Sequence, residues 1–260
     1  MATDTHVDLH HVDEGAPGGP AVLLGASLGT THRMWDALAA DLARDFRVVR
    51  FDTRGHGGSP APAAPYTVEE LAADVIALAD RLGIERFAYA GISLGGAIGQ
   101  RLGVDHGDRL TAFALCSTAP VFGTPDMWEE RAKKVRTEGT QALVDATVER
   151  WFTPEFREEH PDQVDWIMSM FRATPAEGYA GCCAALAKFD ATDELAAIRV
   201  PTLVVAGSED PTCPPSVGQA MVESIPDSEL VVIDDAAHIT NVARPEAFNA
   251  AIRAHLEKHR

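Results

Sequence analysis

The stretch from Phe87 to Gly99, FAYAGISLGGAIG, constrains the fold of this chain more than any other. A short apolar run leads into Gly91-Ile92-Ser93-Leu94-Gly95, and small residues follow. Glycines two positions before and after the serine allow a strand and a helix to approach closely enough to hold the serine in a strained turn. The pattern predicts a buried strand, a sharp turn that presents the Ser93 hydroxyl, and a helix whose first N–H groups face the same space. We predict that Ser93 is a catalytic nucleophile; the alternative is a purely structural glycine-rich turn.

Apolar runs alternate with amphipathic segments along most of the chain. Thr67 and Glu70 fit a capping box at the start of one helix, Gly83 stands where that helix would end, and Pro245 opens a last helix. Alternating strands and helices predict an α/β fold with a mostly parallel, doubly wound sheet covered on both faces. Besides the strand before Ser93, we expect strands at 21–24, 47–52, 110–117, 200–207 and 229–233.

The alternation stops between residues 120 and 195. This stretch contains helix-forming runs rich in aromatic residues and no convincing strand. We predict a helical lid at 120–195, inserted into a core made of residues 1–119 and 196–260, above the carboxyl ends of the strands where ligands bind in such sheets. At the N-terminus, weak alternation over Val7–Val12 predicts an edge strand, followed by a turn cluster at Asp13–Pro20.

Composition excludes several classes of partner. The chain has 260 residues, 46% of them hydrophobic, which is enough for one large core. Its formal net charge of −17 repels phosphate backbones and anionic lipids, so we expect neither nucleic-acid nor membrane binding. Such a surface does not steer anions either, so a carboxylate substrate would need local basic residues.

The four cysteines form no C-x-x-C pair, and the N-terminus lacks the pattern of a signal peptide. We therefore expect a cytoplasmic protein with reduced thiols in its core, and no disulfide or zinc site. No motif for a nucleotide or for catalytic zinc is present either, so we predict no metal and no cofactor. The sequence leaves the oligomeric state open.

A serine hydroxyl needs a base, and the base needs an acid that fixes its tautomer. With this kind of turn the chain order is serine, acid, histidine. The turn after strand 200–207 supplies Asp210 as the acid, with Glu209 as its nearest rival and a turn-capping role as the alternative. The loop after the last strand supplies His238 as the base.

Other titratable residues are expected to have simpler roles. Asp234 and Asp235 solvate the loop before His238, and His56, in a glycine-rich loop that faces the site, stabilises that loop. Acyl transfer also requires donors for an oxyanion. We expect the backbone N–H of Leu94 to be one donor and the loop after strand 21–24 to supply the other, from Ser27, with Leu28 next in line; the alternative for Ser27 is an ordinary loop serine.

The chain resembles a known family from about residue 20 to its C-terminus. The Asp52-Thr53-Arg54-Gly55-His56-Gly57 loop and the Ser93 turn are shared by many hydrolases, whereas the motifs in the predicted lid discriminate more finely. The similar segments are Ser27-Leu28-Gly29-Thr30, Met34-Trp35, Ile98-Gly99-Gln100, Arg150-Trp151-Phe152-Thr153-Pro154 and Gly178-Tyr179-Ala180-Gly181. With these segments the chain resembles 3-oxoadipate enol-lactonase, an α/β-hydrolase of the β-ketoadipate pathway of aromatic catabolism.

The resemblance implies a Ser93, Asp210, His238 triad that opens a lactone through an acyl-enzyme and releases 3-oxoadipate. In that mechanism the N–H groups of Ser27 and Leu94 would hold the oxyanion. It also implies a substrate carboxylate, for which we nominate Arg131, three residues after Trp128. The alternative is that Arg131 belongs to a solvated basic helix face. Trp128 and Trp151 are expected either to wall the pocket or to pack inside the lid.

Two alternative functions stay open. One is a carboxylesterase or lactonase of the same fold with another small-molecule substrate, because pocket shape decides specificity. The other is a non-catalytic ligand receptor on this scaffold, which the presence of all three triad members disfavours.

Overall fold

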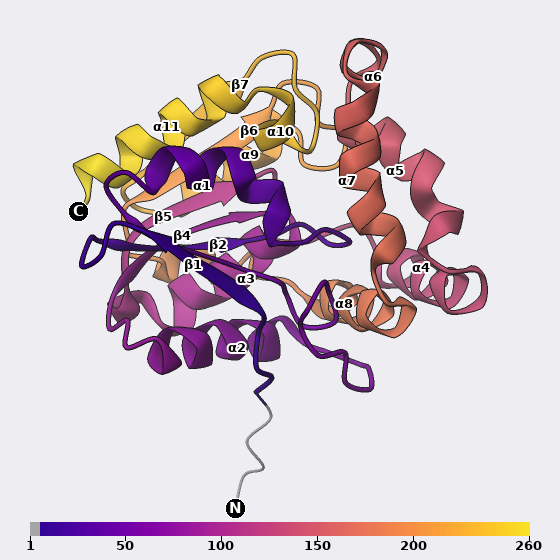
Figure 1. The fold of residues 1–260 in the computed structure, drawn as a ribbon, viewed down its shortest axis with the longest axis horizontal. Coiled ribbons are helices and arrows are strands. Elements are labelled where there is room, and N and C mark those ends of the chain that lie inside the picture. The colour runs from indigo at the N-terminus through magenta and orange to yellow at the C-terminus, as the bar shows by residue number, and fades with distance from the viewer. Residues whose placement is uncertain (1–5) are drawn as a thin grey trace, which may run out of the picture.

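The computed structural model describes residues 6–260, which contain a seven-stranded sheet in the order β1-β3-β2-β4-β5-β6-β7 (Figure 1). β1 pairs antiparallel with β3, and all other neighbours are parallel. The strands are β1 (His11–Gly15), β2 (Ala21–Gly25), β3 (Arg47–Phe51), β4 (Phe87–Ile92), β5 (Leu110–Cys116), β6 (Thr202–Gly207) and β7 (Ser228–Ile233). The predicted α/β class and mostly parallel sheet are confirmed.

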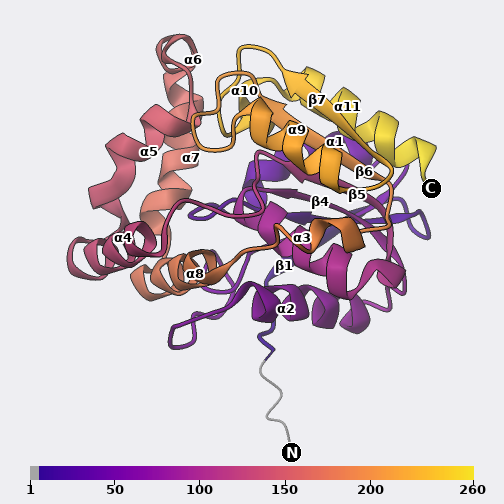
Figure 2. The ribbon, with the colours of Figure 1, turned by 180° about the vertical axis from the view of Figure 1, so that it is seen from behind.

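Helices cover both faces of this sheet. Figure 1 shows α1 and α11 on one face, and Figure 2, from behind, shows α3 and α9 on the other, with α2 beside α3. The bounds are α1 (Asp36–Leu42), α2 (Val68–Arg81), α3 (Leu94–Asp105), α9 (Pro215–Ser224), α10 (Thr240–Ala243) and α11 (Pro245–Lys258). The predicted capping box opens α2: the Thr67 hydroxyl accepts from the Glu70 N–H at 3.2 Å, and the Glu70 carboxylate accepts from the Thr67 N–H at 2.9 Å.

The edge strand differs from the predicted one. It lies at His11–Gly15 rather than Val7–Val12, because its register is set by antiparallel pairing with Arg47–Phe51 of β3. The Arg47 guanidinium also donates to the Asp13 carboxylate at 2.6 Å, which keeps Asp13 in the strand rather than in the predicted turn.

Five α-helices lie between β5 and β6 in sequence and stand together beside the sheet (Figure 2). Prolines at the starts of α4, α6 and α7 favour helix initiation, and the Thr124 and Thr153 hydroxyls cap α4 and α6. Within 120–195, which the structure describes completely, strand-like pairing is limited to one bridge between Val121 and Asp190, as predicted. We call this group the inserted helices: α4 (Pro125–Glu138), α5 (Val144–Trp151), α6 (Pro154–Glu159), α7 (Pro161–Ala173) and α8 (Ala176–Lys188).

The inserted helices touch the sheet's loops through backbone. A Cβ added at Gly178 of α8 would lie 2.0 Å from the carbonyl oxygen of Gly55, in the loop after β3. Only glycine permits this approach, which places α8 next to the carboxyl ends of the strands, where the predicted site residues lie.

Two further observations concern membrane-spanning helices and the cysteines. Among residues 6–260, no helix combines the length and the apolar character needed to cross a bilayer. The four cysteines, Cys116, Cys182, Cys183 and Cys213, are buried free thiols, as predicted.

Candidate active site

Ser93 occupies the predicted strand–turn–helix. It lies between β4 and α3 with φ 56° and ψ −112°, a conformation that a residue with a Cβ adopts only under strain. The flanking glycines allow it: a Cβ at Gly91 would lie 2.3 Å from the Gly95 carbonyl oxygen, and one at Gly95 would lie 2.2 Å from that of Gly25. The Ser93 N–H donates to the Cys116 carbonyl at 3.0 Å, which ties the turn to β5.

The predicted acid and base meet in space. Nδ1 of His238 lies 2.8 Å from Oδ2 of Asp210, and each residue is 2% exposed. The other carboxylate oxygen, Oδ1, accepts from the N–H groups of Thr212 (2.8 Å) and Cys213 (3.0 Å). Burial alone would raise the pKa of Asp210, but His238 and these two N–H groups hold that pKa below its usual value. Asp210 is therefore an anion that can fix the His238 ring and stabilise it when it is protonated.

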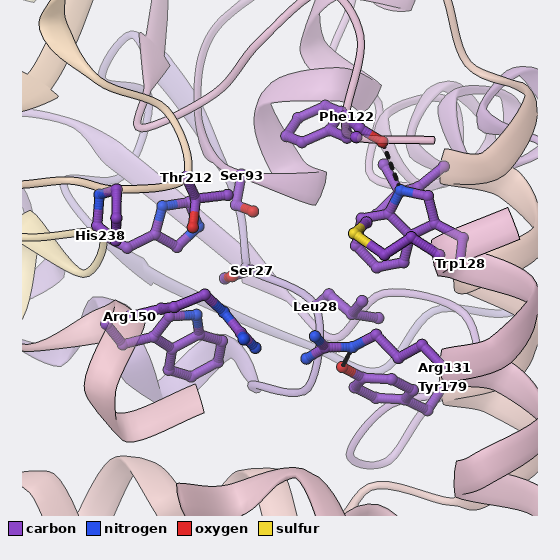
Figure 3. Close-up of a pocket in the computed structure, with 15 residues that line it drawn as sticks. Ser27, Leu28, Ser93, Phe122, Trp128, Arg131, Arg150, Tyr179, Thr212 and His238 are labelled. Atoms are coloured by element: carbon purple, nitrogen blue, oxygen red, sulfur yellow. Dashed lines mark hydrogen bonds between the residues drawn. The ribbon is translucent and has the colours of Figure 1, made fainter. Parts of the chain in front are cut away.

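Ser93 and His238 line the same cavity (Figure 3). Since Nδ1 of His238 faces Asp210, its Nε2 is the nitrogen left to act as a base. Among the hydrogen bonds of the described residues, none joins the Ser93 hydroxyl to His238. Such contacts are often long in an enzyme without substrate and shorten when substrate binds.

The two predicted oxyanion donors differ in their surroundings. Leu94 is the first residue of α3, so its N–H has no acceptor within the helix. Ser27 lines the cavity, but its N–H donates to the Sδ atom of Met34 at 3.3 Å. The Ser27 hydroxyl is buried and has no hydrogen-bond partner among the described residues. This pattern differs from the expected backbone donor at Ser27.

The cavity has a volume of about 310 Å³. Trp128 and Trp151 both line it, and both also pack within the inserted helices, so the two expected roles coincide. Trp128 donates its indole N–H to the Phe122 carbonyl at 2.6 Å, and Trp151 stacks on His238 at 6.4 Å between ring centroids. With the Trp128 N–H satisfied, the two indole rings give the cavity largely apolar walls.

Two arginines face this cavity. Arg131 of α4 donates from Nε to the Tyr179 hydroxyl at 2.7 Å and lies over the Trp128 ring, whereas Lys133 and Lys134 of the same helix are exposed. Arg150 of α5 is half-buried and also lines the cavity (Figure 3). Burial, and next the positive charge of Arg131, lower the pKa of the Arg150 guanidinium. Neither arginine forms an ion pair with a described carboxylate, and the charge of Glu149 offsets only part of the effect on Arg150, so the cavity holds two positive charges in a chain of net charge −17.

Sequence reasoning missed Arg150, Tyr179 and Thr212 as cavity residues. Arg150 and Tyr179 stand within motifs that carry the family resemblance, and that position was their signal. Thr212, two residues after Asp210, had none. Burial raises the pKa of Tyr179, so its phenol stays protonated while it accepts from Arg131.

The remaining candidates lie apart from the chemistry. Glu209 is exposed while its neighbour Asp210 is buried, and Asp234 and Asp235 are exposed, the latter 3.4 Å from the Arg244 guanidinium. His56 is buried and its Nε2 accepts from the Gly29 N–H at 2.9 Å, while Nδ1 faces the Arg54 carbonyl at 3.2 Å. Burial lowers the pKa of His56, so the neutral ring holds the loop after β2, in line with the loop-stabilising role expected for it.

Two groups of described side chains could each offer three metal ligands. In Asp210, Cys213 and His238 the carboxylate already accepts three hydrogen bonds, and burial raises the pKa of the Cys213 thiol, whereas metals bind the thiolate. In the other group, His10 and His32 donate to the Asp52 carboxylate, which also accepts backbone N–H groups of His32 and Gly58 and thereby joins three loops. Neither arrangement gives a metal a part in the chemistry of Ser93.

Comparisons with known proteins agree on the fold family of this chain. The family model for the alpha/beta hydrolase fold matches residues 17–245. The chain is 38% identical to 3-oxoadipate enol-lactonase 2 of Acinetobacter baylyi, over 98% of this chain and 96% of that protein. Its structure matches that of the enol-lactonase from Burkholderia xenovorans with a TM-score of 0.94 and 41% identity, over 96% of this chain and 97% of the other. It matches a thermophilic esterase from Thermogutta terrifontis, solved with malate bound, with a TM-score of 0.94 and 32% identity, over 98% and 95% of the two chains.

Proposed function

Since this chain belongs to the α/β-hydrolase family and is a lactone or ester hydrolase related to the enol-lactonases, we propose that Ser93, His238 and Asp210 are its catalytic triad. The observation that carries this proposal is the 2.8 Å contact between His238 Nδ1 and Asp210 Oδ2, in a cavity that also receives Ser93 from a strained turn. With Nδ1 committed to the acid, Nε2 is free to take the proton of the Ser93 hydroxyl.

We propose that the substrate is 3-oxoadipate enol-lactone. In the first half-reaction the Ser93 oxygen attacks the lactone carbonyl while His238 Nε2 accepts its proton. Donors at the turn, with the Leu94 N–H among them, stabilise the negative charge that develops on the carbonyl oxygen. The bond between the carbonyl carbon and the ring oxygen then breaks, and that oxygen takes the proton from His238 and leaves as an enol. The product is an ester of Ser93 whose acyl chain still carries the enol.

The second half-reaction frees the enzyme. His238 Nε2 takes a proton from water, and the water oxygen attacks the ester carbonyl. The Ser93 oxygen leaves and recovers the proton, and the enol of the released acid tautomerises to the ketone, 3-oxoadipate. Asp210 stays ionised throughout and holds the ring in the same tautomer.

The two cavity arginines, which have no ion-pair partner among the described carboxylates, support an anionic substrate. A carboxylate on the lactone would neutralise charge that Arg131 and Arg150 now carry against each other, and charge-assisted hydrogen bonds to guanidinium are among the stronger polar contacts in proteins. The small cavity and its tryptophan walls suit a compact ring. The name of the Acinetobacter relative supports the same substrate, and the name of the Burkholderia enzyme supports an enol-lactone.

We further propose that residues 120–195 act as a lid on a core of 1–119 and 196–260. In support, the inserted helices supply Trp128, Arg131, Arg150 and Trp151 to the cavity, and the Trp151 carbonyl accepts from the Ile239 N–H, next to His238, at 3.2 Å. We place the reaction in the β-ketoadipate pathway and in the cytoplasm; the four free thiols are in keeping with a reducing compartment.

The second candidate is an esterase with a different small acid, favoured by the similarity to the Thermogutta esterase. Hydrolysis of 3-oxoadipate enol-lactone, compared with p-nitrophenyl acetate and butyrate, separates the two. We expect kcat/KM for the lactone to exceed that for the esters, and Ser93→Ala to abolish both activities. Ser208→Ala, at an exposed serine outside the cavity, is the control and should change neither. Faster turnover of the esters would refute the lactone, and an active Ser93→Ala enzyme would refute the triad.

A further inference from the structure

The loop after β2 presents a buried hydroxyl that has no partner. Ser27 is 2% exposed, lines the cavity together with Ser93 and His238, and its Oγ atom makes no hydrogen bond among the described residues. Figure 3 shows the Ser27 and Ser93 side chains in the same part of the cavity. A hydroxyl hidden from bulk water without a partner costs stability, and this one differs from the other unpartnered buried hydroxyls of the described residues in that it lines the cavity of Ser93 and His238.

The other polar groups of Ser27 are occupied. Its N–H donates to Met34 Sδ at 3.3 Å. Its carbonyl accepts both from the Thr30 N–H at 3.0 Å and from the Thr30 hydroxyl at 2.7 Å. These contacts fix the backbone of Ser27 and turn its N–H toward the sulfur, which leaves the hydroxyl as the group free to act in the cavity.

We propose that the Ser27 hydroxyl donates a hydrogen bond to the oxyanion that forms when Ser93 attacks, beside the N–H of Leu94. The inference rests on the proposed serine-hydrolase function and adds a side-chain donor to the backbone ones, among which the Leu28 N–H, also at the cavity, donates no hydrogen bond among the described residues. A hydroxyl is suited to this task because its proton rotates toward whichever acceptor appears. The transition state therefore gains a contact that the free enzyme lacks, and only such a contact speeds the chemical step.

Ser27→Ala separates this role from the backbone alternative, because alanine keeps the N–H and removes the hydroxyl. We expect kcat to fall roughly 10²-fold, the typical effect of losing one oxyanion donor, with little change in KM. We expect Tm to stay the same or rise, since the variant removes an unpartnered buried hydroxyl. Ser27→Cys, which preserves volume but donates weakly, should lose nearly as much activity and guards against an effect of the cavity left by alanine.

Ser117→Ala is the matched control. Ser117 is 1% exposed, its hydroxyl also lacks a partner among the described residues, and it does not line the cavity. This variant should keep wild-type kcat. If Ser27→Ala retains wild-type kcat while Ser93→Ala is inactive, the hydroxyl is no oxyanion donor and the triad stands. If Ser27→Ala raises KM alone, the hydroxyl binds the ground state and the proposal is refuted. If Ser93→Ala stays active, the proposed function itself fails.

Discussion

Replacing the arginines of the cavity tests how the enzyme recognises its substrate. Arg131 and Arg150 line the cavity without forming an ion pair with a described carboxylate, and the charge of Arg131 disfavours the cation of Arg150. Methionine preserves much of the side-chain volume and removes the charge. We therefore consider Arg150→Met, Arg131→Met and the double variant.

A charge-assisted hydrogen bond contributes about 1.5–3 kcal/mol net, so each single variant should lower kcat/KM for the enol-lactone roughly 10- to 150-fold. The loss should appear mainly in KM, because the carboxylate lies away from the reacting carbonyl and is bound alike in the ground and transition states. The double variant should lose less than the product of the single losses, since both guanidiniums are expected to contact one carboxylate.

Arg150→Met should increase the stability of the protein although it weakens substrate binding. Burial and the charge of Arg131 disfavour the charged form of Arg150 in the folded protein, so Arg150→Met should raise Tm while it weakens binding. A residue kept only for structure would lower Tm when replaced.

The assay is steady-state hydrolysis of the lactone and of neutral p-nitrophenyl acetate, with Tm measured in parallel. Arg136→Met is the control, because Arg136 is exposed and pairs with Glu177 at 2.9 Å outside the cavity. Equal losses on the lactone and the neutral ester would refute a carboxylate-binding role for the two arginines. So would an effect of Arg136→Met as large as theirs.

Three further predictions concern the acid, a glycine contact and pH. Asp210→Asn should keep the fold and lower kcat roughly 10³- to 10⁴-fold in steady-state assays, because the amide neither fixes the tautomer of His238 nor stabilises its protonated ring. A loss of kcat under tenfold would contradict the role of Asp210. Gly178→Ala should lower Tm, although alanine is the better helix former, because its Cβ would lie 2.0 Å from the Gly55 oxygen. The control Gly107→Ala, whose Cβ would have its nearest contact at 3.8 Å, should leave Tm nearly unchanged. Equal shifts of Tm in the two variants would contradict the close contact. Burial lowers the pKa of His56, so this residue binds a proton more readily in the unfolded chain than in the folded protein. The free energy of unfolding, measured with urea, should therefore fall as pH drops below about 6.5, by up to about 1.4 kcal/mol per pH unit. A His56→Gln protein whose free energy of unfolding depends on pH in the same way would contradict this origin.

The Ser93 turn was predictable because its constraints are local. A Cβ at Gly91 would collide with Gly95, four residues later, and one at Gly95 would collide with Gly25 at the end of the neighbouring strand β2. The spacing of the two glycines around Ser93 therefore predicts the geometry of the turn. The choice of Asp210 over Glu209 followed from the turn after β6, and the burial of the first and exposure of the second agree with it.

Other features depend on packing that no local pattern records. Arg150 lines the cavity from α5, which packs against α7, and apart from its place in a motif of the family resemblance nothing in its helical pattern records that orientation. The start of β1 depends on its partner strand β3. The N–H of Ser27 turns toward Met34, seven residues later, only because the intervening loop folds back on itself.

The central claim is that Ser93 is activated by the His238–Asp210 pair, and covalent labelling tests it most directly. A fluorophosphonate reacts with serine hydroxyls that a neighbouring base has activated, and mass spectrometry of the digested protein locates the adduct. We expect one adduct, on the peptide that contains Ser93, formed at a rate that falls at least 10²-fold in His238→Ala. Labelling at another residue, or labelling of Ser93 at the same rate without His238, would contradict the account.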